Sequence, residues 1–319
     1  MMRYEPIPVK AGRAKPPVYK VMTAKEAVSQ YIHENCYLGM TVSAAPASLI
    51  WEIVRQRDRI KTLDLVITSQ IGMSSALIGS GLIRKIEMAY NWGGIEGEDK
   101  VFRRAVEKGI PRPIEVEDYS NFGAAMRWLA ASMGLDFMQT KSQLGSDIIK
   151  NNPRIKVIDD PYNGRPVSLV PASYPDVAVI HAARADEIGN VQCYGIYGNT
   201  DTLARAAKHV IVSVEEIITS AEIRRIPNLT TIPYYYVDAV VHSPFGAHWR
   251  ESSYFYHHDL AFGLDAYQQF ATQEGFDAWA EKYIHGTKDW NEYCQLIGYD
   301  RLNRLMQSEH KYQKYGEVR

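Results

Sequence analysis

Two long runs of β-branched residues constrain the fold of this chain more than any other feature. "VAVIHAARA" covers residues 177–185, and "KHVIVSVEEI" covers residues 208–217. Neither run alternates regularly between apolar and polar residues, which indicates strands that are buried on both faces. Such strands are typical of a parallel sheet covered by helices on its two sides. The runs therefore predict an α/β protein with a mainly parallel sheet.

Shorter segments repeat the order strand, loop, helix. Residues 36–42 are a predicted strand, and a helical pattern follows at 46–56. Residues 63–69 are a second predicted strand, and a helical pattern follows at 75–86. This alternation is typical of a layered α/β fold.

Further helices are predicted along the rest of the chain. The helix at 122–134 has an apolar face, and Gly134 suits its C-cap. The members of that face are Phe122, Ala125, Met126, Leu129, Ala130 and Met133. The stretches at 260–284 and 290–298 also have helical periodicity. We expect them to form a C-terminal helical extension that packs on the sheet or on a neighbour.

The chain shows no sign of division into several domains. Residues 1–20 contain several prolines and predict an irregular arm, and we expect one domain over 21–319. The arm lacks the apolar core of a secretory signal, and no apolar run reaches the length of a membrane span. We therefore expect a cytoplasmic protein.

Charge and cysteine content exclude several classes of function. The 36 basic and 37 acidic residues give a net charge of −1, so neither nucleic acid nor a membrane surface is an expected partner. Cys36, Cys193 and Cys294 are scattered, which argues against a disulfide framework.

The stretch "YHHD" at 256–259 has adjacent histidines without partners at helical spacing, so no metal site is expected.

The acidic stretch "IEVEDYSN" at 114–121 has two interpretations. Its carboxylates could be catalytic, with Ser120 as a catalytic hydroxyl. Alternatively, Ser120 or Asn121 caps the following helix, while Glu115 and Glu117 point outward from a short strand. Spacing alone favours the second interpretation, because capping residues are common before an apolar helix.

Two glycine-containing loops are candidates for a ligand site. "LGSDI" at 144–148 could present backbone N–H groups to an oxygen-rich ligand. "SPFGAHW" at 243–249 contains His248, which could be a general base, a hydrogen-bond donor or a satisfied interface group. The last role fits the sequence best. Ligands of α/β folds bind in loops at strand ends, so we expect the site there.

Several short stretches resemble a known family. They include "VMTAKEAVSQYIH", "LIGSGLIRK", "EDYSN", "LGSD", "PDVAVIHAARADEIGN", "EIRRIPNLTTIP" and "VDAVVHSPFGAH". In this order, between about residues 20 and 305, they resemble the α (A) subunit of family I CoA-transferases of the glutaconate CoA-transferase type. Each stretch is short, but the combination is specific to that family.

The resemblance implies a three-layer α/β CoA-transferase fold and a partner, the β subunit, with the active site between the two chains. It implies that the nucleophile is a glutamate of the β subunit, which attacks the acyl-CoA and passes through an acyl anhydride and a glutamyl-CoA thioester. A CoA thioester and a small carboxylic or dicarboxylic acid would be substrates. No permanently bound cofactor, metal, flavin or nicotinamide is implied.

The resemblance also assigns roles to residues of this chain. Ser120 and Asn121 would offer hydrogen bonds to the acid's carboxylate or to the thioester carbonyl. The remaining substrate-binding residues would shape the cleft, and they are Gly39, Gly145, Ser146, Gly246 and His248. The loop "LGMTVSAAP" is shorter than the glycine-rich loop of the family, so the acid is left open.

A second class of relatives gives an alternative function. These relatives are CoA-dependent hydrolases that open a ring in a steroid-derived thioester, and in them an acidic residue of the α subunit is catalytic. Asn121 stands close to that position and cannot act as the base. Glu117 and Asp118 lie nearby and are the alternative catalytic residues. A non-catalytic binding subunit is a third interpretation, which needs a β partner without its glutamate.

Overall fold

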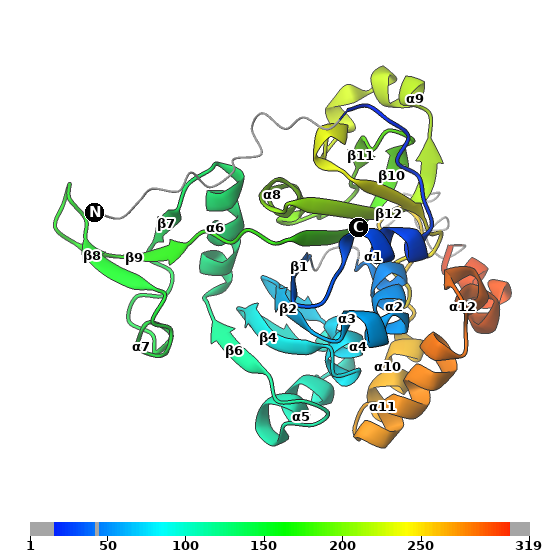
Figure 1. Ribbon diagram of the computed structural model, residues 1–319, viewed down its shortest axis with the longest axis horizontal. Coiled ribbons are helices and arrows are strands. Elements are labelled where there is room, and N and C mark those ends of the chain that lie inside the picture. Colours follow the sequence, from blue (N-terminus) through cyan, green and yellow to red (C-terminus); the bar gives the residue numbers. More distant parts are fainter. Residues whose placement is uncertain (1–15, 42–44, 307–319) are drawn as a thin grey trace, which may run out of the picture.

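The computed structural model describes residues 16–41 and 45–306, and its centre is a mainly parallel sheet (Figure 1). The predicted arm over 1–20 lies largely outside the described residues. From edge to edge the strands are β13 (Ala239–His242), β12 (His209–Ile218), β10 (Val177–Asp186), β1 (Cys36–Met40), β2 (Leu63–Val66), β4 (Ile83–Met88) and β6 (Glu115–Asp118). These strands pair in parallel, and β11 (Val191–Gln192) pairs antiparallel with the end of β10.

The chain fills the sheet from the middle toward both edges. After β1 it adds β2, β4 and β6 on one side, and it then returns to add β10, β12 and β13 on the other. The strand order therefore reverses between β1 and β10. Open α/β sheets bind ligands beyond the carboxyl ends of the strands at such a reversal.

Helices cover both faces of the sheet, which confirms the three-layer α/β fold (Figure 1). One face packs against α1 (Ala24–Tyr31), α2 (Ala47–Arg55), α3 (Arg57–Ile60), α4 (Ser74–Gly79), α5 (Lys100–Lys108), α10 (Leu260–Gln269), α11 (Gln273–Ala280) and α12 (Trp290–Ile297). The opposite face packs against α6 (Asn121–Ser132) and α8 (Thr200–Ala206). The central strands β10 and β12 are buried on both faces, as their sequences predict.

Two smaller sheets accompany the central one. β3 (Ser69–Ile71) and β5 (Tyr90–Trp92) form a parallel pair that continues from the ends of β2 and β4. β7 (Phe137–Thr140), β9 (Pro166–Pro171) and β8 (Lys156–Asp159) form an antiparallel sheet at one side of the molecule (Figure 1). Further short helices include α7 (Ile148–Asn151), α9 (Ser220–Arg225), η1 (Gly94–Glu96), η2 (Pro227–Leu229), η3 (Tyr234–Tyr236) and η4 (Glu281–His285).

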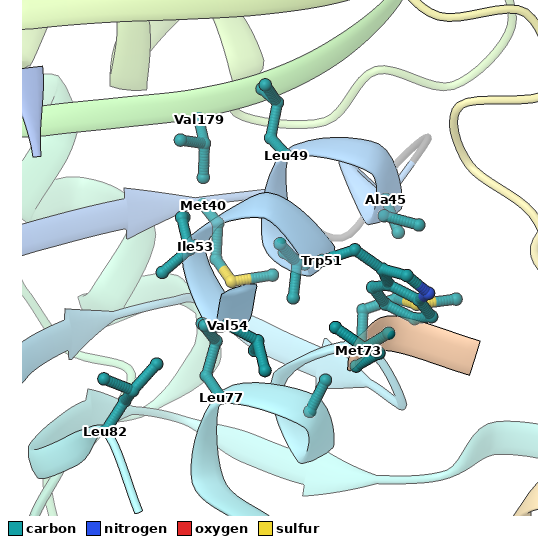
Figure 2. Packing of buried hydrophobic residues seen from close by; sticks show 14 of the residues in the cluster. Met40, Ala45, Leu49, Trp51, Ile53, Val54, Met73, Leu77, Leu82 and Val179 are labelled. Carbon is teal, nitrogen blue, oxygen red and sulfur yellow. The ribbon is translucent and has the colours of Figure 1, made fainter. Parts of the chain in front are cut away.

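The C-terminal helices pack on α2 through a cluster of aromatic rings. Trp51 of α2 has no exposed surface, and the rings of Trp249, Trp279 and Tyr293 meet it edge-on at centroid distances of 6.1, 5.7 and 5.9 Å. Figure 2 shows Trp51 beside Met73 in this core. Edge-on pairs add to the stability that burial provides. The predicted C-terminal extension therefore packs on the chain's own helices.

The helix predicted at 75–86 is wrong in its second half. α4 ends at Gly79, where a Cβ atom would lie 2.5 Å from the ring of Phe276. Gly81 then adopts a φ of +72° and turns the chain, and residues 83–88 form β4. The turn needs a backbone conformation that glycine adopts at little cost.

The buried face of α6 is not the apolar face that its sequence predicts. Phe122 and Met133 are 54% and 60% exposed, although they belong to the predicted stripe. The buried residues are Gly123, Ala124, Arg127, Trp128, Ala130 and Ala131. Of the predicted stripe, therefore, only Ala130 is fully buried. The inward face includes a buried arginine because the sheet offers that arginine an acidic partner.

Arg127 forms a buried ion pair with Glu87 of β4. Its Nη2 lies 2.7 Å from Glu87 Oε2, and the two side chains are only 2% and 6% exposed. Tyr37 of β1 donates to the same carboxylate at 2.6 Å, and Arg127 Nε donates to the carbonyl of Pro171 at 3.1 Å. Burial alone would raise the pKa of Glu87, but Arg127 and Tyr37 lower it. The pair thus fastens α6 to the sheet and to β9.

Replacement of Arg127 by Met should lower the free energy of unfolding by about 3 kcal/mol. Breaking a buried pair typically costs 3–5 kcal/mol, and the lower end applies because Lys85 and Arg154 still lie 3.4 and 3.2 Å from Glu87. Urea unfolding measures the change. The double variant R127M/E87Q should recover part of the loss, and a single variant as stable as the wild type would contradict the assigned role.

Candidate active site

The candidate site lies at the carboxyl edge of the sheet, where β2, β4 and β6 end. Ser69 at the start of β3 donates its hydroxyl to Asn121 Oδ1 at 3.2 Å. Ser69 is also the register partner of Tyr90 in β5. Three chain segments that are far apart in sequence therefore meet at these residues. β1 ends at the same edge of the sheet, and residues 42–44 after it lie outside the described residues.

Ser120 is the N-cap of α6. Its backbone is extended, and its Oγ accepts a hydrogen bond from the N–H of Gly123 at 3.0 Å. The expected helix cap is therefore confirmed for Ser120. The same hydroxyl lies 2.6 Å from Ser142 Oγ and 3.2 Å from Gln143 Oε1. Ser120 thus joins the helix to the loop that follows β7.

The loop that contains Gly145 and Ser146 lies next to this N-cap. Ser146 donates its hydroxyl to the carbonyl of Gln143 at 2.7 Å, and Gln143 is 1% exposed. Gly145 has a φ of +79°, and a Cβ atom there would meet nothing within 4 Å. The structure therefore brings Ser120, Asn121 and this loop together, with Gly145 facing open space.

Gly39 lies elsewhere, in the interior of β1. A Cβ atom at this position would meet Leu203 of α8 at 2.6 Å and Pro175 at 3.0 Å. The glycine is therefore needed because α8 approaches the sheet closely. It is not part of the loop that follows the strand.

Gly246 belongs to the loop after β13, which packs on the start of α2. Its carbonyl accepts from the N–H of Ser48 at 3.0 Å, and a Cβ atom would lie 2.5 Å from His181 Cε1. Glu215 holds this loop, because it accepts from the N–H of Phe245 at 2.7 Å and from His181 at 2.7 Å. The loop is therefore fixed by a buried carboxylate.

His248 lies in the core and does not reach Ser120 or Asn121. It has no exposed surface, and its ring nitrogens contact Tyr293 OH at 2.7 Å and Asp259 Oδ2 at 3.2 Å. Arg301 donates to the same carboxylate at 2.5 and 2.8 Å. Burial lowers the pKa of His248 although Asp259 favours the charged ring. His248 is therefore a buried residue whose ring nitrogens both have hydrogen-bond partners within the chain.

The two alternative acids differ in their availability. Glu117 does not point outward as predicted, because it pairs with Lys85 at 2.5 Å and with Arg154 at 3.2 Å and is 11% exposed. It also accepts from the Tyr119 hydroxyl. No described residue donates to the carboxylate of Asp118, and burial raises its pKa. Asp118 is thus the more available of the two.

Arg250 is a site-supporting residue that sequence reasoning missed. It is 9% exposed, donates through Nη2 to the carbonyl of Gly93 at 2.8 Å and lies 3.0 Å from Glu96 Oε2. A Cβ atom on Gly72 would meet the same Nη2 at 3.0 Å. Arg250 therefore supports the turns after both β3 and β5. The only feature of the sequence that could have indicated Arg250 is its position directly after the stretch "SPFGAHW".

Two kinds of feature are absent from the part of the chain that the structure describes. Its His, Cys, Asp and Glu side chains form no group of three or more that could hold a metal ion. None of its helices is both long and apolar enough to span a bilayer.

The sequence and the fold together identify the family. Residues 21–243 match the family described as Coenzyme A transferase. The chain belongs to the coenzyme A transferase family. This result confirms the resemblance that the short motifs carry. By sequence and fold the chain is an α-type subunit of a CoA-transferase.

Individual CoA-transferase relatives are similar over most of their length. The A subunit of the 3-oxoadipate CoA-transferase of Pseudomonas knackmussii is 36% identical over 283 residues, which are 87% of this chain and 98% of that protein. The crystal structure of glutaconate coenzyme A-transferase from Acidaminococcus fermentans superposes with a TM-score of 0.83 at 33% identity, covering 90% of this chain and 95% of the other. A cholesterol ring-cleaving hydrolase subunit of Mycobacterium tuberculosis is 29% identical over 50% of this chain and 58% of that protein.

The Asp259 cluster predicts a pH dependence of stability. Burial alone would raise the pKa of Asp259, but Arg301 and His248 outweigh it and hold the pKa below its usual range. A depressed carboxyl pKa stabilises the fold above the unfolded value of about 4, and this contribution is lost as the pH falls further.

The stability difference between the wild type and Asp259→Asn should therefore shrink as the pH falls from 6 to 3. Urea unfolding at a series of pH values measures this difference. Asp265→Asn, at an exposed position of α10, is the matched control and should follow the wild type throughout. A difference that stays constant below pH 4 would refute the linkage.

Proposed function

We propose that this chain is the α subunit of a two-subunit enzyme that moves CoA between an acyl-CoA and a small carboxylic acid. We further propose that the β subunit supplies the nucleophilic glutamate. One observation carries this proposal. Ser69, Ser120 and Asn121 gather at the carboxyl edge of the sheet, and no carboxylate of a described residue hydrogen-bonds to any of them. The site has hydrogen-bonding groups for a substrate but no nucleophile in contact with them.

Four carboxylates near this edge already have structural partners, unlike Asp118. Glu87 and Glu117 are ion-paired, and Glu215 holds the loop after β13. Glu96 has no exposed side-chain surface and pairs with Arg250. A carboxylate held in such contacts is a weak nucleophile, because attack on a thioester would require it to leave its hydrogen bonds. A glutamate from a second chain avoids this cost.

Asn121 is the best placed group for contact with substrate. Its Oδ1 accepts from Ser69, which directs the two N–H groups of Nδ2 away from that contact. Asn121 is exposed at the first turn of α6, where the helix dipole favours negative charge. The amide would therefore bind the acceptor carboxylate or the oxyanion that forms when the thioester carbonyl is attacked.

Two of the transferase relatives are named for 3-oxoadipate and glutaconate, which are both dicarboxylic acids. We therefore propose that the acceptor is a dicarboxylic acid. The test uses this chain co-purified with its β subunit. The complex is incubated with a panel of acyl-CoAs, with and without acceptor acids. Borohydride is then added, and the modified residue is mapped by mass spectrometry.

Acceptor-dependent exchange of CoA, with a reduced glutamate on the partner and none on this chain, is the expected result. Turnover without any acceptor, and without a trapped glutamate, would exclude the transferase.

Variants of Ser120 and Asn121 separate binding from helix capping. Asn121→Ala should lower kcat/KM by about 10- to 100-fold, as expected for the loss of a hydrogen bond to a charged group, with little change in melting temperature. Ser120→Ala should cost about 1 kcal/mol of stability because the cap is lost. Ser120→Asn restores the cap and is the control. If S120N has wild-type kinetics, Ser120 acts only as a cap; unchanged kinetics of N121A would remove Asn121 from the site.

One observation favours ring-opening hydrolysis as a second candidate function. Asp118 ends β6 at this edge, no described residue donates a hydrogen bond to its carboxylate, and burial shifts its pKa upward, which is the direction that favours a general base. Asp118→Asn separates the two functions. It should leave CoA exchange intact in a transferase and abolish turnover in a hydrolase.

A further inference from the structure

Four large apolar side chains form an exposed ridge beside the candidate site. They are Tyr90, Trp92, Ile95 and Phe122, with exposed fractions of 48, 40, 68 and 54%. Tyr90 is the register partner of Ser69, which donates to Asn121, and Asn121 precedes Phe122 in the chain. The ridge therefore runs along the rim of the site, from the start of α6 to the loop after β5.

The loop after β5, which carries Ile95 of the ridge and follows Trp92 directly, has a fixed shape. Glu96 has no exposed side-chain surface, and it accepts hydrogen bonds from Trp249 Nε1 at 3.1 Å and His258 Nε2 at 2.9 Å. Arg250 pairs with Glu96 and donates to the carbonyl of Gly93 at 2.8 Å. Exposed apolar groups on a preorganised loop lose little conformational entropy when a partner binds.

A pocket of about 240 Å³ opens beside Trp92. Its apolar lining includes Trp92, Phe102 and Val106, and Val106 is 43% exposed. Its rim carries Arg103, which pairs with acidic neighbours on both sides. An apolar centre with a charged rim is the usual composition of a protein interface, and a pocket of this size accepts a large partner side chain.

The size of the ridge also fits an interface. Aromatic side chains have about 150–250 Å² of surface, so the three aromatic residues of the ridge, each roughly half exposed, present on the order of 300 Å², and Ile95 adds about 100 Å². Apolar patches of this size on a monomer are often functional. The area is about half of the roughly 800 Å² that each protein buries in a standard interface.

We propose that this ridge docks the β subunit, with Trp92 as the central anchor, and that docking closes the rim of the site to water. The identity of the partner rests on the proposed function. A second copy of this chain fits less well, because it would bring the same hydrogen-bonding groups and not the glutamate of the β subunit. A β subunit seated on the ridge would bring its glutamate next to Asn121.

The test measures binding of the separately purified β subunit to the full chain and its variants. Trp92→Ala and Ile95→Ser should each raise Kd at least tenfold. Phe137→Ala is the matched control, because Phe137 is also an aromatic residue, 51% exposed, and lies on the small sheet. It should change Kd less than twofold. Circular dichroism and melting temperature show whether each variant is folded, and Ile95→Ser covers the case in which Trp92→Ala is not.

Several outcomes would overturn the docking proposal. Wild-type affinity of both ridge variants, or an equal loss for Phe137→Ala, would place the interface elsewhere. A raised KM for acyl-CoA, with unchanged affinity between the two subunits, would make the ridge a CoA contact. Self-association of the chain that depends on Trp92, with unchanged affinity for the β subunit, would make it a homodimer face.

Acyl exchange measured on the same mixtures of the two subunits distinguishes the docking proposal from the proposed function. Ridge-dependent assembly without acyl exchange would refute the transferase and keep the docking face. Acyl exchange, together with assembly that does not depend on the ridge, would support the transferase and refute the docking face.

Discussion

The contact between Arg127 and Glu87 determines where the candidate site lies. It joins α6 to β4, the strand next to the edge of the sheet, at the cost of burying two charges, and Arg127 is the most buried of the cations that pair with Glu87. Ser120 and Asn121 begin the same helix two turns earlier. Their position relative to Ser69 therefore depends on how α6 is seated. A helix held only by apolar contacts could slide or rotate at smaller cost, whereas an ion pair at 2.7 Å has one favourable geometry.

Buried acids recur in the molecule in the same kind of role. Glu215 fixes the loop after β13, Glu96 fixes the loop after β5, and Asp259 ties the C-terminal helices together through Arg301. Each accepts several hydrogen bonds, so each stabilises a loop or joins elements that propensity alone would leave free. These buried acids thus fix the loops and helices that surround the candidate site.

Sequence patterns predicted the parts of the fold that depend on burial along a strand. The runs at 177–185 and 208–217 became the central strands β10 and β12. The same reasoning failed for α6, because periodicity records which side chains are apolar and not which neighbours they meet. His248 was a candidate ligand residue by its place after a strand, but the C-terminal helices cover it completely. The anchors His181 and Glu215 stand inside apolar runs, and that departure from the pattern was the available signal.

The fixed loops bear on how a CoA-transferase limits hydrolysis. An acyl anhydride reacts readily with water, so the enzyme must exclude water while still admitting an acceptor acid. A rim that is rigid before assembly can be closed by a partner surface of matching shape, without a mobile lid. Differences in substrate between relatives would then arise in segments that these anchors do not hold.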